Sequence, residues 1–341
     1  MTAIRACLTC AMTVIVLTFL YAVPAPGGTT QLDYRLKWLF NASVAGDIYA
    51  SEKGLFSAQG LTVNVKEGSP EKNAITELEL GHADFGVASA DQVIRALDKG
   101  AAIVVIAQLF QVNPMQWIYR ANRPEIKSLK DLKGRSIGVT FGGNDETIMN
   151  TLLASAGLTN RDVRLSGVRF DFTPFLKKKV EIWPVYRNSQ GVILEDKLKQ
   201  EGEAVRFFNP ATFGVSFVAN SVITTESMLR DHPETVTRFL NALLSGWEAA
   251  MDPANEAVTL DLLKTFDKGN TDRIRKLQLD ATRDLIMPFS SVPIGTMDTD
   301  AWIQTETIML SQKQIKNPVS IATHLVCMPG TLLGSEGSPG H

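Results

Sequence analysis

The chain has 341 residues, of which 45% are hydrophobic and 21% are charged. This is an ordinary globular composition with enough length for two compact domains, so extensive disorder is not expected. The formal net charge is −2, and the 34 Lys and Arg residues are scattered along the chain rather than gathered into a basic stripe. The charge distribution therefore argues against nucleic acid as a partner.

The N-terminal residues have the features of a secretory signal. Arg5 precedes an apolar stretch over 6–23, which prolines and small residues follow. Cleavage after Gly27 would satisfy a small-x-small rule with Ala25 and Gly27. We expect 1–28 to be a signal peptide, with the mature chain starting near Gly28 in the periplasm. An uncleaved anchor is the alternative, because about 18 apolar residues are at the edge of spanning length.

Cysteine and histidine usage argues against metal and nucleophilic chemistry. Cys7 and Cys10 lie inside the expected signal, which leaves Cys327 in the mature chain, so we expect no intrachain disulfide and no Cys-rich metal cluster. The four histidines show no metal-ligand spacing, and no residue pair has the pattern of a nucleophile with its base. We expect no cofactor, no metal and no catalytic residues, and so a protein that is not an enzyme.

Strand-like and helix-like patterns alternate from Leu32 onwards and predict an α/β fold with mostly parallel strands. In the first part of the chain, strands are expected at 36–40, 61–65, 83–88, 101–108 and 115–120. Helices are expected at 46–59, 72–80 and 91–97, and a glycine follows each of them, as at many helix ends.

A polar segment over 121–134 then predicts a linker. Beyond it, strands are expected at 135–140, 163–170, 180–186 and 215–223, and helices at 145–156, 173–179 and 192–200. Mostly helical patterns follow from Thr225, including a helix that starts at Pro233. We expect one lobe from 32–125 and 214–316, a second lobe from 126–213, and a tail over 317–341.

Two crossings between the same pair of lobes, near 121–126 and 209–214, predict a two-segment hinge. Clefts between lobes are favoured ligand sites, and hinged lobes close around ligands. The pattern therefore predicts capture of a ligand by closure.

Five segments in a fixed order carry a family resemblance. They are AGDIYASEKGLFSAQGLTVNVKEG (45–68), GHADFGVASADQVIRAL (81–97), SLKDLKGRSIGVTFGGNDE (128–146), FGVSFVANSVITT (213–225) and HPETVTRFLNALLSGWEAAMDPANEAV (232–258). The chain resembles the periplasmic binding proteins of nitrate, sulfonate, taurine and thiamine-pyrimidine transporters, a family that includes thiamine pyrimidine synthase-like proteins. The resemblance implies a type II two-lobed fold with a ligand cleft and an ABC transporter permease as partner.

By position, the resemblance places ligand contacts in the loops at strand ends. The candidate ligand-binding residues are Asn41, Ser43, Ser89, Asp91, Gln92, Trp117, Gly142, Gly143, Asn144, Glu146, Tyr186 and Asn188. The family's desulfinases depend on a cysteine and its pyrimidine synthase on a Cys-rich motif, so the cysteine-poor chain favours a receptor over an enzyme.

The segment GGNDET at 142–147 gives the most informative short pattern. The two glycines allow close backbone approach, and Asn144 is expected to cap the following helix. A helix N-terminus normally favours an anion, but Asp145 and Glu146 occupy its first turn and would repel a sulfonate or phosphate. Asp145 is interpreted as an acid that stabilises the helix dipole, and Glu146 as a ligand contact that accepts a hydrogen bond from an amino or ring N–H group.

Aromatic residues gather near the expected strand ends and could stack on a flat ring. They are Trp38, Trp117, Phe172, Trp183 and Tyr186. Burial in the core is the alternative for each of them, and Tyr186 has the strongest claim to a ligand contact. The run Lys177 to Lys179 is expected to face solvent at a helix end.

Together with these patterns, the resemblance implies a monomeric solute-binding component of an ABC importer. Its ligand is expected to be a small flat nitrogen heterocycle, such as a thiamine-precursor pyrimidine or a riboflavin-like molecule. Two alternatives stay open: an enzyme of thiamine-pyrimidine biosynthesis, and a receptor for anions of the sulfonate or nitrate type.

Overall fold

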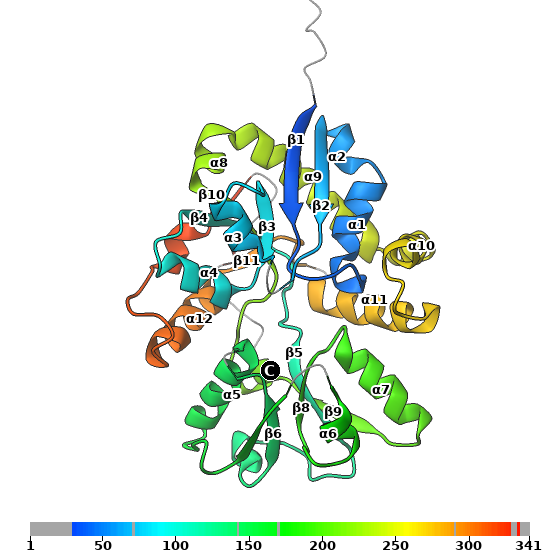
Figure 1. Cartoon of the computed structure of the whole chain (residues 1–341), viewed down its shortest axis with the longest axis vertical. Coiled ribbons are helices and arrows are strands. Elements are labelled where there is room, and N and C mark those ends of the chain that lie inside the picture. The colour runs from blue at the N-terminus through cyan, green and yellow to red at the C-terminus, as the bar shows by residue number, and fades with distance from the viewer. Residues whose placement is uncertain are drawn as a thin grey trace, which may run out of the picture.

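The computed structural model of the chain describes residues 29–69, 72–141, 143–168, 171–289, 291–328 and 333–334. The expected signal peptide at 1–28, Gly142 and much of the expected tail lie outside these residues. Among the described residues, no helix is long and apolar enough to cross a membrane. The elements form two α/β lobes, one above the other in Figure 1, as the sequence predicted.

The first lobe is built on a five-stranded sheet in the order β2-β1-β3-β10-β4. Its strands are β1 (Thr30–Arg35), β2 (Leu61–Lys66), β3 (Phe85–Ala88), β4 (Ile103–Gln108) and β10 (Ser221–Thr225). β1 pairs in parallel with β2 and β3, whereas β10 is antiparallel to β3 and β4. Strand β10 therefore comes from the part of the chain that follows the second lobe.

Helices flank both faces of this sheet, with α1, α10 and α11 on the right of Figure 1 and α3, α4 and α12 on the left. The helices of this lobe are α1 (Ala45–Glu52), α2 (Leu55–Ala58), α3 (Ala74–Glu79), α4 (Ala90–Leu97), α8 (Glu226–Asp231), α9 (Pro233–Met251), α10 (Glu256–Phe266), α11 (Asp272–Ile286) and α12 (Thr299–Ser311). Shorter pieces are β11 (Met297–Asp298), β12 (Leu333–Gly334) and 3-10 turns at Ala42–Val44, Leu129–Leu132, Pro210–Phe213, Pro253–Asn255 and Ile321–His324.

Helix α9 starts at Pro233, as predicted, and anchors the core of the first lobe. The ring of Phe239 stacks on Phe85 of β3, with centroids 3.8 Å apart and planes 5° apart. α1 packs closely against α9, because a Cβ at Gly46 would lie 2.1 Å from Trp247 Cδ2. A substitution at Gly46 would therefore push the two helices apart.

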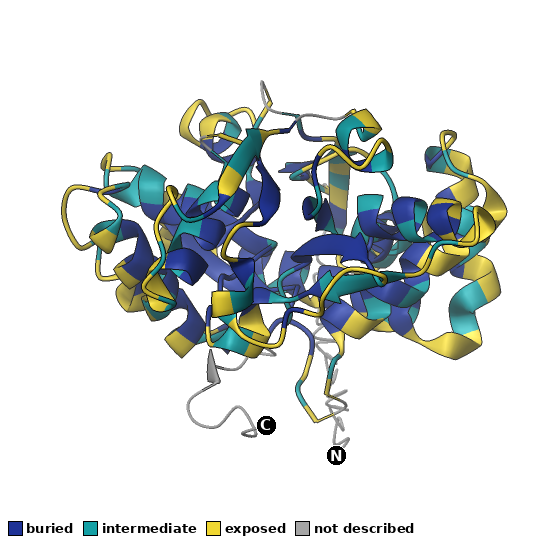
Figure 2. Ribbon diagram, turned by 90° about the horizontal axis from the view of Figure 1, so that it is seen from below, coloured by how far each residue is buried: buried dark blue, intermediate teal, exposed yellow. Residues whose placement is uncertain are grey.

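The second lobe holds a three-stranded antiparallel sheet and a parallel strand pair. β5 (Met115–Arg120) lies between β8 (Trp183–Tyr186) and β9 (Val205–Phe208), and β6 (Ser136–Val139) pairs with β7 (Arg164–Gly167). A backbone hydrogen bond of 2.8 Å from Gly138 N to Ile182 O connects the two sets of strands. The helices are α5 (Asn144–Ser155), α6 (Thr173–Leu176) and α7 (Gln190–Gln200). Figure 2, seen from below, shows buried residues in the interior and exposed ones around the edge.

Because β5 hydrogen-bonds with β8 and β9, it belongs to the second sheet, although the sequence pattern placed it before the first crossing. The chain passes between the sheets over 109–114 and 209–220. These two segments contact each other, since Asn113 Nδ2 donates to Phe217 O over 2.7 Å and Leu109 N donates to Asn220 O over 3.0 Å. The connection between the lobes is thus a pair of hydrogen-bonded segments.

Two strand predictions were wrong in position. The first strand is Thr30–Arg35 and not 36–40, because Leu32 and Tyr34 alternate into the core while 36–40 forms a loop in which Leu39 is 49% exposed. The buried segment 215–220 forms no strand, so β10 starts only at Ser221. In sequence, a short apolar run looks the same whether it forms a buried strand, a loop beside a cavity or a buried crossing segment.

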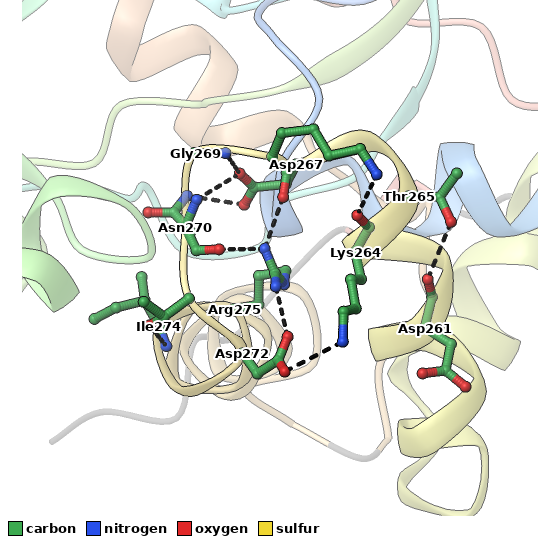
Figure 3. Close-up of polar contacts among 11 residues, drawn as sticks. Asp261, Lys264, Thr265, Asp267, Gly269, Asn270, Asp272, Ile274 and Arg275 are labelled. Atoms are coloured by element: carbon green, nitrogen blue, oxygen red, sulfur yellow. Dashed lines mark hydrogen bonds and ion pairs between the residues drawn. The ribbon is translucent and has the colours of Figure 1, made fainter.

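The turn between α10 and α11 is held by a compact set of polar contacts (Figure 3). The Asp267 carboxylate accepts hydrogen bonds from the backbone N–H groups of Gly269 and Asn270, both over 3.2 Å. The buried guanidinium of Arg275 donates to Asp267 O over 2.7 Å and to Asp272 Oδ1 over 2.5 Å. These bonds fix the start of α11, which contacts α7 of the second lobe.

Candidate functional site

A cavity of about 580 Å³ lies between the lobes, within the size range of small-molecule sites. Its walls come from both lobes: the loop after β1, the starts of α3 and α4, the first crossing segment, the start of α5, and the end of β8 with the turn that follows. Seven of the candidate residues line it: Asn41, Ser43, Gln92, Gly143, Asn144, Tyr186 and Asn188. The loops expected to bind ligand therefore meet around one cavity.

Four other candidates do not line the cavity. Ser89 Oγ donates to Asp91 Oδ1 over 2.6 Å, and Asp91 forms an ion pair of 2.7 Å with Arg95, so this pair organises the start of α4. Trp117 is fully buried and its Nε1–H donates to Gly138 O over 3.2 Å, which makes it part of the second lobe's core. Glu146 follows Asp145 by one residue, and successive helical side chains point about 100° apart, so Asp145 faces the cavity and Glu146 does not.

The start of α5 differs from the prediction. Gly143 is the N-cap residue and has no side chain to cap the helix, whereas Asn144 is already the first helical residue. The expected capping role of Asn144 was therefore wrong. A Cβ at Gly143 would lie 2.5 Å from Asp145 Oδ1 and 2.8 Å from Thr140 O, so this close approach requires glycine.

The sequence indicates a helix-dipole role for Asp145, and the structure places this residue in the cavity wall. Its Oδ2 accepts a hydrogen bond from Thr140 N over 2.6 Å, and the side chain is almost entirely buried. Burial raises the pKa of Asp145 to about 6, even though hydrogen bonds from Thr140 oppose this shift. A carboxylate in this position can accept hydrogen bonds from N–H groups placed in the cavity.

Five aromatic residues line the cavity: Trp38, Phe110, Phe172, Trp183 and Tyr186. Phe172 and Trp183 meet edge to face, with ring centroids 6.5 Å apart. Across the cavity, Trp38 comes from the first lobe and is 36% exposed. Aromatic surface from both lobes is suited to holding a flat ring between them.

Lys37 is a cavity residue that the sequence analysis missed. Its Nζ lies 5.9 Å from the ring centroid of Tyr186, so a cation of the first lobe faces an aromatic ring of the second. It was overlooked because 36–40 was interpreted as a strand, in which Lys37 had no assigned role. Lys37 and Asp145 are the charged side chains among the described residues that line the cavity.

Polar contacts join the lobes on both sides of the cavity. On one side, Asn188 Nδ2 donates to Thr282 Oγ1 over 3.0 Å, and Arg273 pairs with Asp196 over 2.7 Å. On the other, Gln312 Nε2 donates to Thr147 O over 3.0 Å. The lobes therefore contact each other around the cavity in this conformation. Among the described residues, no group of three or more His, Cys, Asp or Glu is placed to hold a metal ion.

Comparison with known proteins identifies the family. A sequence model described as NMT1/THI5 like matches residues 41–257, more than half of the chain. The chain belongs to this family. The resemblance noted in the sequence is thereby confirmed.

Three curated relatives are similar over most of their own length. The chain is 27% identical over 233 residues to a "putative thiamine biosynthesis protein" of Haemophilus influenzae, covering 67% of this chain and 71% of the relative. It is 24% identical over 293 residues to the "formylaminopyrimidine-binding protein" of Halalkalibacterium halodurans, covering 84% and 87%. It is also 24% identical over 317 residues to the "riboflavin-binding protein RibY" of Chloroflexus aurantiacus, covering 88% and 87%.

The fold matches that of solved periplasmic binding proteins. The aliphatic sulphonate binding protein SsuA from Escherichia coli superposes with a TM-score of 0.70 at 15% identity, covering 91% of this chain and 96% of SsuA. The chain therefore has the two-lobed periplasmic binding protein fold that the sequence predicted.

Proposed function

We propose that the protein is the solute-binding component of an ABC importer and that it captures a small, flat nitrogen heterocycle in the cavity between its lobes. The observation that carries the proposal is the cavity wall itself. Aromatic rings from both lobes surround a space of about 580 Å³ whose polar edge includes the carboxylate of Asp145. A thiamine-precursor pyrimidine and a riboflavin-like molecule both have flat rings with N–H groups.

The lining residues suit such a ring on its faces and at its edges. Stacking against Trp38 and Tyr186 would bury both faces of the ring, and aromatic contacts add about 0.5–1.5 kcal/mol each beyond burial. The amides of Asn41 and Gln92 can donate and accept hydrogen bonds at the ring's edge. Asp145 adds an acceptor for an amino or ring N–H group.

Names of the relatives support this ligand class. Two relatives that cover most of this chain are named for binding a formylaminopyrimidine and riboflavin. The alternative of an enzyme of thiamine-pyrimidine biosynthesis is supported by the name of the Haemophilus relative. A receptor for small anions is supported less, because the likeness to SsuA shows the fold alone and a buried carboxylate in the cavity repels a sulfonate.

Export and partnership follow from the same proposal. We place the protein in the periplasm, delivered there by the N-terminal signal, where it binds ligand as a monomer and then docks to a membrane permease. We assign 126–213 to the second lobe together with β5. The described part of the expected tail packs on the first lobe, because Ile321 and Leu325 are buried there and Val326 N donates to Val105 O over 2.8 Å. Catalysis has no part in the proposed role.

The proposal is tested by identifying and measuring the ligand. Native mass spectrometry of gently purified protein would show a bound small molecule of heterocyclic mass. Calorimetric titration should then give tight binding of riboflavin or of 4-amino-5-hydroxymethyl-2-methylpyrimidine, and weak binding of taurine and nitrate. Tight binding of taurine with no binding of either heterocycle would replace this proposal with the anion receptor.

A further inference from the structure

The backbone around Lys37 is held so that its side chain reaches the cavity. Gly68 N donates to Trp38 O over 3.1 Å, and a Cβ at Gly68 would lie 2.1 Å from Leu36 O, so the loop lies directly on Gly68. Glu67 Oε1 accepts a hydrogen bond from Phe40 N over 2.6 Å. The loop that carries Lys37 is therefore fixed on both sides of this residue.

The ammonium of Lys37 lacks a carboxylate partner in the part of the chain that the structure describes. Two residues earlier, Arg35 is paired with Glu77 at 2.9 Å. Lys37 is half-buried and faces the ring of Tyr186 at 5.9 Å, and it forms no ion pair with Asp145, which comes from the opposite lobe. Among the described residues, the cavity thus has one cation on the first lobe and one acid on the second.

A half-buried ammonium that faces an aromatic ring is only partly compensated. A ring face attracts a cation more weakly than a carboxylate or phosphate does, since an opposite charge both pairs with the ammonium and accepts its hydrogen bonds. A ligand that brings an anionic group to Lys37 would supply this opposite charge when the lobes close. At the other side of the cavity, the Asp145 carboxylate would accept a hydrogen bond from an N–H group of the same ligand.

We infer that Lys37 determines ligand specificity: it selects heterocycles that carry an acidic substituent, a carboxylate or a phosphate, in addition to an N–H edge that faces Asp145. This inference deepens the proposed function and rests on it for the flat ring. It differs from the anion receptor alternative, because small anions such as taurine and nitrate have no ring to fill the aromatic part of the cavity.

The test is calorimetric titration of the purified mature chain with matched ligands. The phosphate arm compares riboflavin with riboflavin 5′-phosphate and 4-amino-5-hydroxymethyl-2-methylpyrimidine with its phosphate. A carboxylate arm uses 4-amino-2-methylpyrimidine-5-carboxylate, and a ring without nitrogen is supplied by benzyl alcohol and benzyl phosphate. The variants are Lys37→Met, Lys37→Arg and, as a matched control, Lys53→Met on the exposed surface of the same lobe.

The expected result is tighter binding of the acidic member of at least one heterocyclic pair. Lys37→Met should weaken that binding about 10- to 100-fold, the range for a hydrogen bond to a charged group, and change binding of the neutral member less than about 3-fold. Lys37→Arg should retain most of the preference, and Lys53→Met should change nothing. If Lys37→Met loses more affinity for the phosphate ligands than for the carboxylate ligand, the preferred substituent is a phosphate. The opposite result identifies a carboxylate.

The other outcomes separate this inference from the proposed function. Equal binding of neutral and acidic heterocycles, with no selective loss in Lys37→Met, would overturn the role of Lys37 and keep the heterocycle receptor. Binding of benzyl phosphate alone, lost in Lys37→Met, would keep the role of Lys37 and overturn the heterocycle. Failure of every ligand to bind would overturn both.

Discussion

Asn188 of the second lobe and Thr282 of the first are joined by a hydrogen bond of 3.0 Å from Asn188 Nδ2 to Thr282 Oγ1, and both residues are buried. The Thr282 hydroxyl in turn donates to Gln278 O over 2.8 Å, so its oxygen is held in position to accept. Asn188 also lines the cavity. One side chain therefore connects the cavity wall to the contact between the lobes.

Because of this hydrogen bond, we expect Thr282→Val to weaken ligand binding, although Thr282 does not line the cavity. Valine keeps the shape of threonine but removes the acceptor, and a buried hydrogen bond contributes about 0.5–1.5 kcal/mol, so the Kd should rise about 2- to 10-fold. Thr307→Val, on an exposed face of α12, is the matched control and should leave the Kd unchanged. Equal Kd values for Thr282→Val and the unchanged protein would show that this bond does not stabilise the bound conformation.

Asp145 predicts that affinity for an N–H ligand depends on pH. Burial raises the pKa of Asp145 to about 6, and a ligand N–H that donates to the carboxylate favours its ionised form, so affinity should increase as the pH rises through about 6. Titration with riboflavin, which does not itself ionise between pH 5 and 8, isolates this group. Asp145→Asn should flatten the profile and weaken binding at pH 8 by about tenfold. A profile that stays pH-dependent in Asp145→Asn would assign the titration to another group.

A buried acid that does not line the cavity predicts a second pH effect, on stability. Tyr34 Oη donates to Asp47 Oδ1 over 2.6 Å, and burial raises the pKa of Asp47 to about 7 from its usual 3.8. Because the folded-state pKa is raised, this carboxyl stabilises the fold below about pH 4, and the contribution is lost as the pH rises through about 7.

Asp47→Asn removes that titration and keeps an acceptor for Tyr34. Its melting temperature should exceed that of the unchanged protein by at least about 3 °C at pH 8, with a smaller difference at pH 5. The exposed Asp261→Asn serves as the matched control and should leave the profile unchanged. Melting curves of the three proteins between pH 5 and 8 decide this, and a difference that does not vary with pH would contradict it.

Export predicts a processed N-terminus. Protein collected from the periplasm should begin near Gly28, because Ala25 and Gly27 supply the small residues of a cleavage site. N-terminal sequencing of the periplasmic fraction checks this. Recovery of the protein in the membrane pellet with Met1 intact would instead show an anchor.

The sequence predicted the two-lobed fold because glycines at helix ends and alternating apolar runs depend on local backbone geometry. It was less successful where burial depends on distant parts of the chain. The run at 36–40 resembles a strand, yet it forms the loop that presents Lys37 to the cavity. Similarly, nothing local distinguishes Asp145 from Glu146, since the orientation of α5 decides which of them faces the cavity, and Trp117 is as aromatic as Trp183 but points into the core.

The central claim, that ligand is captured between the lobes, is tested most directly by small-angle scattering paired with thermal melting. With riboflavin or the aminopyrimidine at 100 times its Kd, the radius of gyration should fall, and stability should rise by about 2.7 kcal/mol, a few degrees for a chain of this size. Tyr186→Ala should remove much of this shift. Lys178→Ala should leave the shift unchanged, because Lys178 does not line the cavity and forms an ion pair of 2.9 Å with Glu203. An unchanged radius of gyration, together with a thermal shift that survives in Tyr186→Ala and is lost in Lys178→Ala, would contradict both the closure and the placement of the site.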